Sequence, residues 1–110
     1  MKWTEEKIKN EWTGISVVEV SGESCANCLT LLPILNRLMD SRTDAVLRHI
    51  EVSEEIMPLL EKWEVEAVPS ILILYNDTVF AKCRGYQPEE ILEIWLNAKI
   101  DELKKKMNLN

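Results

Sequence analysis

Cys25 and Cys28 are the residues of this chain whose type and spacing most directly suggest chemistry. They follow an apolar segment and precede a long stretch rich in leucine, which places them where a strand passes into a helix. A Cys-x-x-Cys pair can exchange with a disulfide or bind a metal, and two neighbouring cysteines can also be incidental. The pair by itself leaves these three interpretations open.

The composition restricts the function classes. A length of 110 residues predicts one domain over residues 1–110, and a net charge of −6 argues against nucleic acid or an anionic membrane as a partner. No apolar run approaches the ~20 residues of a membrane span, and the first residues lack the apolar core of a signal peptide. Three cysteines do not make a disulfide-rich scaffold, so we expect a reducing, cytoplasmic setting.

Hydrophobic periodicity predicts the elements that position the two cysteines. We expect four strands, at residues 15–20, 46–52, 71–75 and 79–84. We expect four helices, at residues 4–12, 25–39, 53–64 and from residue 88 onward. This order predicts an α/β fold with a mixed sheet and helices on both of its faces.

Prolines refine the predicted helices. Pro33 falls inside the helix over residues 25–39, where the missing N–H predicts a kink. Pro58 fits an early helical position better than the middle of a helix, and Pro88 is expected at the first position of the last helix.

Four landmarks together resemble the thioredoxin family. They are Cys25-Ala26-Asn27-Cys28 after a strand, Pro33 in the next helix, Val68-Pro69-Ser70 before the most apolar strand, and Gly85 after the last strand. Their separations, 44 residues from Cys25 to Pro69 and 16 more to Gly85, match the family pattern. The resemblance covers residues 12–100 and implies a thioredoxin fold with four strands. The family's first strand is missing, and the strands at 46–52 and 79–84 form opposite edges.

The resemblance implies a thiol–disulfide cycle. Cys25 would stand at a helix N-terminus, where free N–H groups and the helix dipole favour the thiolate. Cys25 would attack the substrate disulfide, and Cys28 would resolve the mixed disulfide. Glu19, a charged residue in an apolar strand, would be the buried acid of raised pKa that takes the proton of Cys28. The alternative is that the Glu19 side chain merely reaches solvent at the edge of the strand.

The resemblance also implies a substrate-binding surface. Val68–Pro69 would be a cis peptide beside the thiols, so that an extended substrate could pair with the Val68 backbone. The alternative is a trans proline that opens a strand. Ser24 and Gly85 complete the expected substrate-binding set. The family usually carries Trp at the position of Ser24 and Gly-Pro between the cysteines, so we expect a different substrate range and redox potential.

A zinc site is the remaining chemical alternative, because three cysteines and one histidine would complete a ligand set. In the implied fold, His49 and Cys83 lie on opposite edge strands, three spacings of ~4.8 Å apart. They could not both reach one ion with bonds of about 2 Å. We therefore predict no metal site, and Cys83 is either a small apolar filler or an exposed thiol.

These arguments predict a cytoplasmic thiol–disulfide oxidoreductase that reduces protein disulfides through Cys25 and Cys28. It would need no bound cofactor and would receive electrons from a protein resembling a thioredoxin reductase. The alternative function is a thioredoxin-like interaction module with little or no redox turnover, which the lost tryptophan and the missing first strand suggest.

Overall fold

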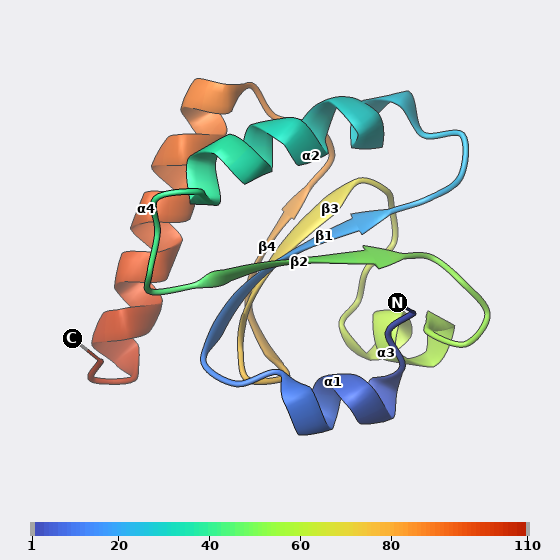
Figure 1. The fold of residues 1–110 in the computed structure, drawn as a ribbon, viewed down its shortest axis with the longest axis horizontal. Coiled ribbons are helices and arrows are strands. Elements are labelled where there is room, and N and C mark those ends of the chain that lie inside the picture. Colours follow the sequence, from blue (N-terminus) through green and yellow to red (C-terminus); the bar gives the residue numbers. More distant parts are fainter. Residues whose placement is uncertain (1, 110) are drawn as a thin grey trace.

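The computed structural model describes residues 2–109, so residues 1 and 110 of the expected domain lie outside the described residues. The described chain has the predicted order of helices and strands (Figure 1). The elements are α1 Glu5–Glu11, β1 Ile15–Ser21, α2 Ala26–Met39, β2 Val46–Glu51, α3 Met57–Lys62, β3 Ser70–Tyr75, β4 Thr78–Arg84 and α4 Glu89–Lys106.

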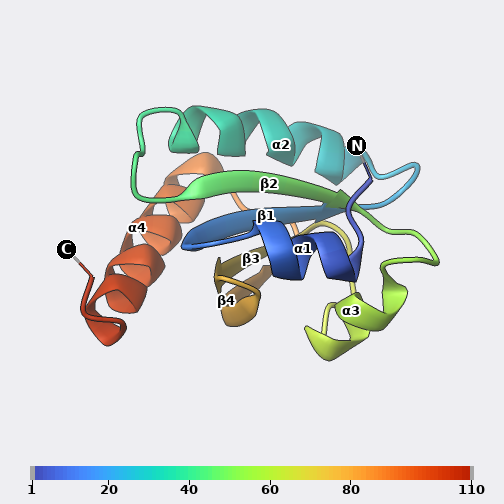
Figure 2. The ribbon, with the colours of Figure 1, turned by 60° about the horizontal axis from the view of Figure 1, so that its bottom comes forward.

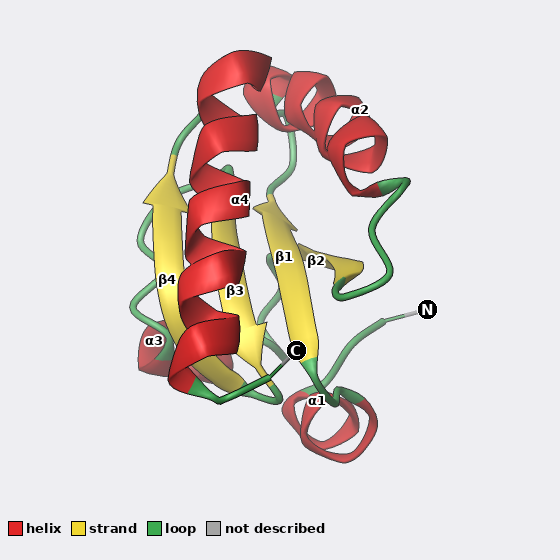
Figure 3. Cartoon of the chain, turned by 90° about the vertical axis from the view of Figure 1, so that its left-hand side faces the viewer, coloured by secondary structure: helices red, strands yellow, loops and turns green. Residues whose placement is uncertain are grey.

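The four strands form one mixed sheet in the order β2-β1-β3-β4. β1 runs parallel to β2 and antiparallel to β3, and β3 runs antiparallel to β4 (Figure 3). The predicted α/β class, the mixed sheet and the edge positions of β2 and β4 are therefore confirmed. Within residues 2–109 no strand precedes β1, and α1 stands in that part of the chain.

Helices cover both faces of the sheet, α2 and α4 on one and α1 and α3 on the other (Figures 1 and 2). Side chains of β1 alternate between two cores, with Val17 in the cluster below α2 and α4 and Val18 in the cluster with α1 and α3. Residues Ser70–Leu74 of β3 are buried, as the continuous apolar run of this central strand predicted. Each fully buried aliphatic side chain stabilises the fold by about 1.5–3 kcal/mol.

Helix α1 begins as predicted, whereas the other three helices begin later than predicted. The Thr4 side chain caps α1 by accepting the backbone N–H of Lys7. α3 begins at Met57 instead of residue 53, because Pro58 lacks an N–H and fits only the first turn. Pro88 is the N-cap of α4 and not its first helical residue, because its ψ of 150° is extended.

Helix α2 positions the cysteine pair. It begins at Ala26, one residue later than predicted, because Cys25 has extended backbone and serves as the N-cap. The helix continues past Pro33 to Met39. The kink at Pro33 stays a prediction.

Candidate functional site

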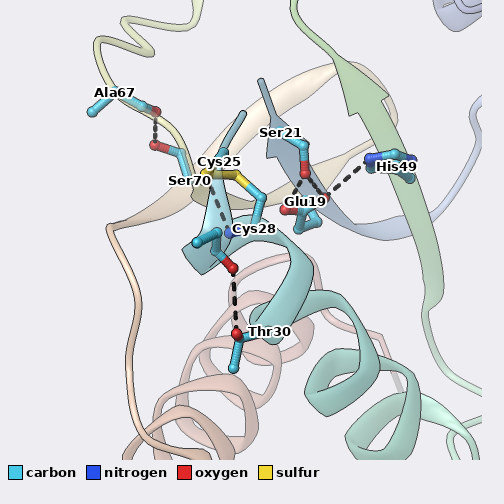
Figure 4. Close-up of a disulfide and its surroundings, with 9 residues drawn as sticks. Glu19, Ser21, Cys25, Cys28, Thr30, His49, Ala67 and Ser70 are labelled. Carbon is cyan, nitrogen blue, oxygen red and sulfur yellow. Dashed lines mark hydrogen bonds and ion pairs between the residues drawn. A yellow bond between two sulfur atoms is a disulfide. The ribbon is translucent and has the colours of Figure 1, made fainter. Parts of the chain in front are cut away.

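Cys25 and Cys28 form a disulfide at the N-terminus of α2, with their Cα atoms 5.2 Å apart (Figure 4). Cys25 is partly exposed, whereas Cys28 is only 4% exposed. The Sγ atom of Cys25 also accepts the backbone N–H of Cys28 at 3.2 Å. The sulfur of Cys25 is thus the more accessible of the two, and Cys28 is largely shielded from solvent.

The electrostatics of this helix end favour a thiolate at Cys25 once the disulfide is reduced. The N–H of Cys28 already points at the sulfur, and the first turn of α2 carries no acidic residue. A helix N-terminus bears partial positive charge, which lowers the pKa of a cysteine placed there. The arrangement makes Cys25 the better nucleophile of the two.

Glu19 is completely buried in β1, at 0% exposure. Burial raises the pKa of Glu19 above its ordinary value, and this outweighs the opposing effects of a hydrogen bond from Ser21 and the charge of His49. The Ser21 hydroxyl oxygen lies 2.6 and 2.5 Å from the two carboxylate oxygens and donates a hydrogen bond to them. The alternative that Glu19 reaches solvent is wrong.

His49 is the neighbour of Glu19 that sequence reasoning did not assign to the site. Its Nε2 atom lies 3.3 Å from Glu19 Oε1, because the two residues are aligned in the parallel pairing of β1 with β2. Ser21 was likewise overlooked, although its position two residues after Glu19 puts both side chains on the same face of the strand. Figure 4 shows dashed lines from the Glu19 carboxylate to both Ser21 and His49.

The Val68–Pro69 peptide is cis, as predicted. Ser70 pairs with Val20, which places Pro69 at the end of the sheet where β1 leads into Cys25. Gly22 packs against this segment, since a Cβ built on it would lie 3.1 Å from Val68 Cγ2. Glycine at position 22 therefore allows the loop after β1 to approach the cis-proline segment.

Gly85 and Ser24, the other two residues of the predicted substrate-binding set, both have a positive φ angle. The N–H of Gly85 donates to the carbonyl of Pro69 at 2.8 Å, and Gly85 has a φ of 83° that favours glycine. Ser24 has a φ of 53°, in the left-handed region, directly before Cys25. A residue other than glycine in this conformation costs about 1–2 kcal/mol.

A groove of about 610 Å³ runs beside the disulfide. One wall comes from α2, with Leu29, Leu32 and Pro33, and the opposite wall comes from β2, with His49 and Glu51. Leu29 is 80% exposed one residue after Cys28, which leaves an apolar side chain available to a partner. The groove can receive an extended segment with an apolar side chain beside the sulfurs.

The family assignment rests on a match that spans most of the chain. The family model described as Thioredoxin matches residues 2–98. The chain belongs to the thioredoxin family. Membership together with the close pair of Cys25 and Cys28 indicates a thiol–disulfide oxidoreductase.

Proteins similar to this chain come from several different organisms. The chain is 24% identical over 90 residues to "Thioredoxin H-type" of Ricinus communis, covering 81% of this chain and 75% of the relative. It is 26% identical over 85 residues to "Thioredoxin" of Chlamydia pneumoniae, covering 77% and 82%. The solved structure of a mutant thioredoxin from Halobacterium salinarum shares the fold, with a TM-score of 0.67 and 22% identity over 79% of this chain and 75% of that one.

The third cysteine of this thioredoxin-family chain lies apart from the pair. Cys83 is half-buried in β4, and burial raises the pKa of its thiol. Its strand and the β2 strand that carries His49 form opposite edges of the sheet, as predicted. Among residues 2–109 no group of three or more His, Cys, Asp or Glu side chains is arranged to hold a metal ion. No helix in the same range is long and apolar enough to cross a bilayer.

Proposed function

We propose that this protein reduces disulfides in other proteins through a Cys25–Cys28 dithiol–disulfide cycle. The observation that carries the proposal is the asymmetry of the pair. The partly exposed Cys25 caps a helix, and the buried Cys28 lies behind it on the side of a buried carboxyl group (Figure 4). An accessible nucleophile with a protected resolving thiol is the arrangement that this exchange requires.

The cycle transfers two electrons to the substrate. The Cys25 thiolate attacks one sulfur of the substrate disulfide, the substrate S–S bond breaks, and the other substrate sulfur leaves as a thiolate. Cys28 then loses its proton, and its thiolate attacks Cys25 Sγ. The bond between Cys25 and the substrate breaks, the second substrate thiolate leaves, and the Cys25–Cys28 disulfide remains.

Glu19 is proposed to accept the proton that Cys28 loses in the second step. Its burial on the β1 strand and its raised pKa support this role, because a carboxylate of raised pKa takes up protons at pH values where an ordinary glutamate does not. Because Glu19 is buried, the bound substrate does not compete with Cys28 as a proton donor to it.

The substrate is proposed to bind as an extended strand. The backbone of Val68 would pair with it beside Cys25, and Pro69, Ser24 and Gly85 would shape that end of the site. The half-exposed Val68 side chain and the Gly85–Pro69 hydrogen bond support this assignment.

The remaining parts of the proposal concern the setting. Residues 1–110 would act as one domain in the cytoplasm, with protein disulfides as substrates and a thioredoxin-reductase-like protein as the electron donor. No bound cofactor takes part in the exchange, because the two cysteines carry both electrons. The acidic net charge of −6 supports protein partners over nucleic acid.

Reduction of insulin disulfides tests the proposal. The wild type with dithiothreitol as the electron source should accelerate the reaction, and Cys25→Ser should abolish the acceleration. Cys83→Ser is the matched control, because it removes the cysteine outside the pair and should retain full turnover. No acceleration by the wild type under any reductant would contradict the proposal.

The second candidate function is an interaction module with little or no turnover. The serine before Cys25 and the uncovered β2 edge favour it, since both change the surface around the pair. The redox potential of the Cys25–Cys28 pair distinguishes the candidates further. Cycling pairs span about −270 to −120 mV, and a potential well outside that range favours the interaction module.

A further inference from the structure

The Glu19–His49 pair connects the buried carboxyl group with solvent. Glu19 is 0% exposed, whereas the His49 side chain is 38% exposed, and 3.3 Å separates Glu19 Oε1 from His49 Nε2. Both side chains belong to the face of the sheet that α2 covers, since Leu47 of the same strand packs in the α2–α4 core. One end of the pair lies on the side of the disulfide, and the other end reaches water (Figure 4).

The position of β2 makes this connection possible. β2 is an edge strand of the described sheet, so no further strand covers the outer side of His49. His49 also lines the same groove as Cys25 and Cys28, whereas Glu19 is not one of the lining residues. Glu19 therefore has no direct contact with solvent, and a proton that reaches it needs a second group in order to leave.

The chemistry of the two side chains suits a proton transfer. An imidazole accepts a proton on one nitrogen and donates one from the other, and histidine changes charge near neutral pH. Ser21 is the other polar neighbour of the carboxylate, but its hydroxyl does not ionise in this range. The charged groups around His49 are Glu19, Glu51 of the same strand, and Glu23 and Lys2, which line a hollow on its outer side.

We propose that His49 carries the proton of each cycle from Glu19 to solvent and back. The inference rests on the proposed function. When Cys28 loses its proton to the Glu19 carboxylate, the carboxylic acid passes a proton to His49 Nε2, and the imidazolium releases one from Nδ1 to water. The carboxylate is restored, and no electrons move in this step. When the disulfide is reduced again, the proton follows the same path inward.

His49 acts through Glu19, so it is a positioning residue for the proton and not a catalytic residue. A merely electrostatic role would be different, because a fixed positive charge beside Glu19 would lower its pKa without moving protons. Lysine at this position supplies the fixed charge, and alanine removes both functions. The two substitutions at one site therefore distinguish transfer from charge.

The first experiment measures resolution of a mixed disulfide in a Cys83→Ser background. Reduced protein reacts with 5,5′-dithiobis(2-nitrobenzoate), so that Cys25 takes one nitrothiobenzoate group and the attack of Cys28 then releases it as a coloured thiolate. We expect His49→Ala to slow this second release about tenfold at neutral pH, a modest share of general acid–base assistance. Free imidazole should restore the rate, and His49→Lys should not.

Asp44→Asn, at the other end of β2, is the matched control and should leave the release rate unchanged. Three results would each overturn the proposal: an unchanged rate in His49→Ala, a full rate in His49→Lys across the pH range, or no rescue by imidazole.

The second experiment needs no turnover and separates this inference from the proposed function. Carboxyl and imidazole NMR signals of the oxidised protein are followed against pH. The pKa of Glu19 should rise in His49→Ala because the nearby positive charge is lost. If the pKa of Glu19 is the same in His49→Ala and in the wild type, the proposed proton transfer is wrong. A wild type that never releases the second thiolate overturns the proposed function, and the titration still decides whether His49 interacts with Glu19, on which the transfer depends.

Discussion

Glu19 on β1 and Asp44 just before β2 are two carboxyl groups whose surroundings shift their pKa values in opposite directions. Asp44 lies just before the strand, 3.0 Å from Arg42 and 3.1 Å from Lys104 of α4. Partial burial raises the pKa of Asp44, but the hydrogen bonds and charges of Lys104 and Arg42 together outweigh it and lower the pKa. Glu19, beside His49 of β2, is fully buried, and its burial and the charge of Glu51 raise its pKa against the effects of the Ser21 hydroxyl and the charge of His49.

The difference separates a structural carboxylate from one that can exchange protons. Arg42 and Lys104 stabilise the ionised form of Asp44, so this carboxylate does not bind a proton near neutral pH. Its hydrogen bond from Lys104 joins the loop before β2 to α4. Among residues 2–109, no lysine or arginine forms an ion pair with Glu19, whose partners are the Ser21 hydroxyl and the His49 imidazole. Of these two carboxyl groups, Glu19 is therefore the one that can bind and release a proton more readily near neutral pH.

The largest expected effect is kinetic and falls on one carboxyl group only. Glu19→Gln should slow the resolution of the mixed disulfide about 100-fold at neutral pH, because a positioned general base contributes at least this much. Asp44→Asn should leave the rate unchanged. Stopped-flow release of the nitrothiobenzoate group measures both. Equal rates in Glu19→Gln and the wild type would remove Glu19 from the cycle and end the contrast.

The second prediction concerns stability against pH. The raised pKa means that the unfolded chain ionises Glu19 at lower pH than the folded protein does. Stability is therefore lost as the pH rises from the ordinary glutamate range through the raised pKa. Glu19→Gln cannot ionise and should be more stable than the wild type at neutral pH by about 1–3 kcal/mol.

Urea unfolding of the oxidised protein at several pH values measures this difference. The advantage of Glu19→Gln should shrink as the pH falls toward the ordinary glutamate range, where the buried group is protonated in both states. If the difference in unfolding free energy between Glu19→Gln and the wild type does not depend on pH, the pKa of Glu19 is not raised in the folded protein, and the contrast with Asp44 is wrong.

A smaller effect is expected from Ser21→Ala. The Ser21 hydroxyl donates to the Glu19 carboxylate and so lowers its pKa against the effect of burial. Removing the hydroxyl should raise the pKa of Glu19 further and destabilise the ionised protein by about 1 kcal/mol. The carboxyl NMR titration detects the direction. A downward movement of the pKa would mean that the hydroxyl does not stabilise the carboxylate.

The smallest effect is expected at the other carboxyl group. Asp44→Asn should cost about 0.5–1 kcal/mol at neutral pH, because its partners are partly exposed and screened. The sign is opposite to that of Glu19. The lowered pKa gives stability above the ordinary aspartate range, and this is lost as the pH falls through the folded value. Urea unfolding in high salt should reduce the cost, and an undiminished cost would indicate that packing dominates.

Local patterns in the chain were sufficient to locate the redox pair. Strand and helix periodicity around residues 15–39 predicted a strand-to-helix junction at Cys25, and the structure has Cys25 as the N-cap of α2. The order of elements was also predicted correctly from these patterns, whereas the edge positions of β2 and β4 followed from the resemblance to the thioredoxin family. Hydrophobic periodicity and helix capping depend on residues a few positions apart, so they can be predicted from the sequence without knowledge of the tertiary structure.

The environment of Glu19 depended on tertiary structure. The alternation in residues 46–52 placed His49 on the same face as Leu47, but it did not tell which residue of β1 stands beside it. The parallel register of β1 with β2 aligns Glu19 with His49, and a shift by one residue would put Arg48 or Ile50 there instead. The parallel strands β1 and β2 are joined by helix α2 and not by a tight turn, so no short turn sequence indicates the register. Amino-acid types thus determined the chemistry available, and the strand register decided which groups share a proton.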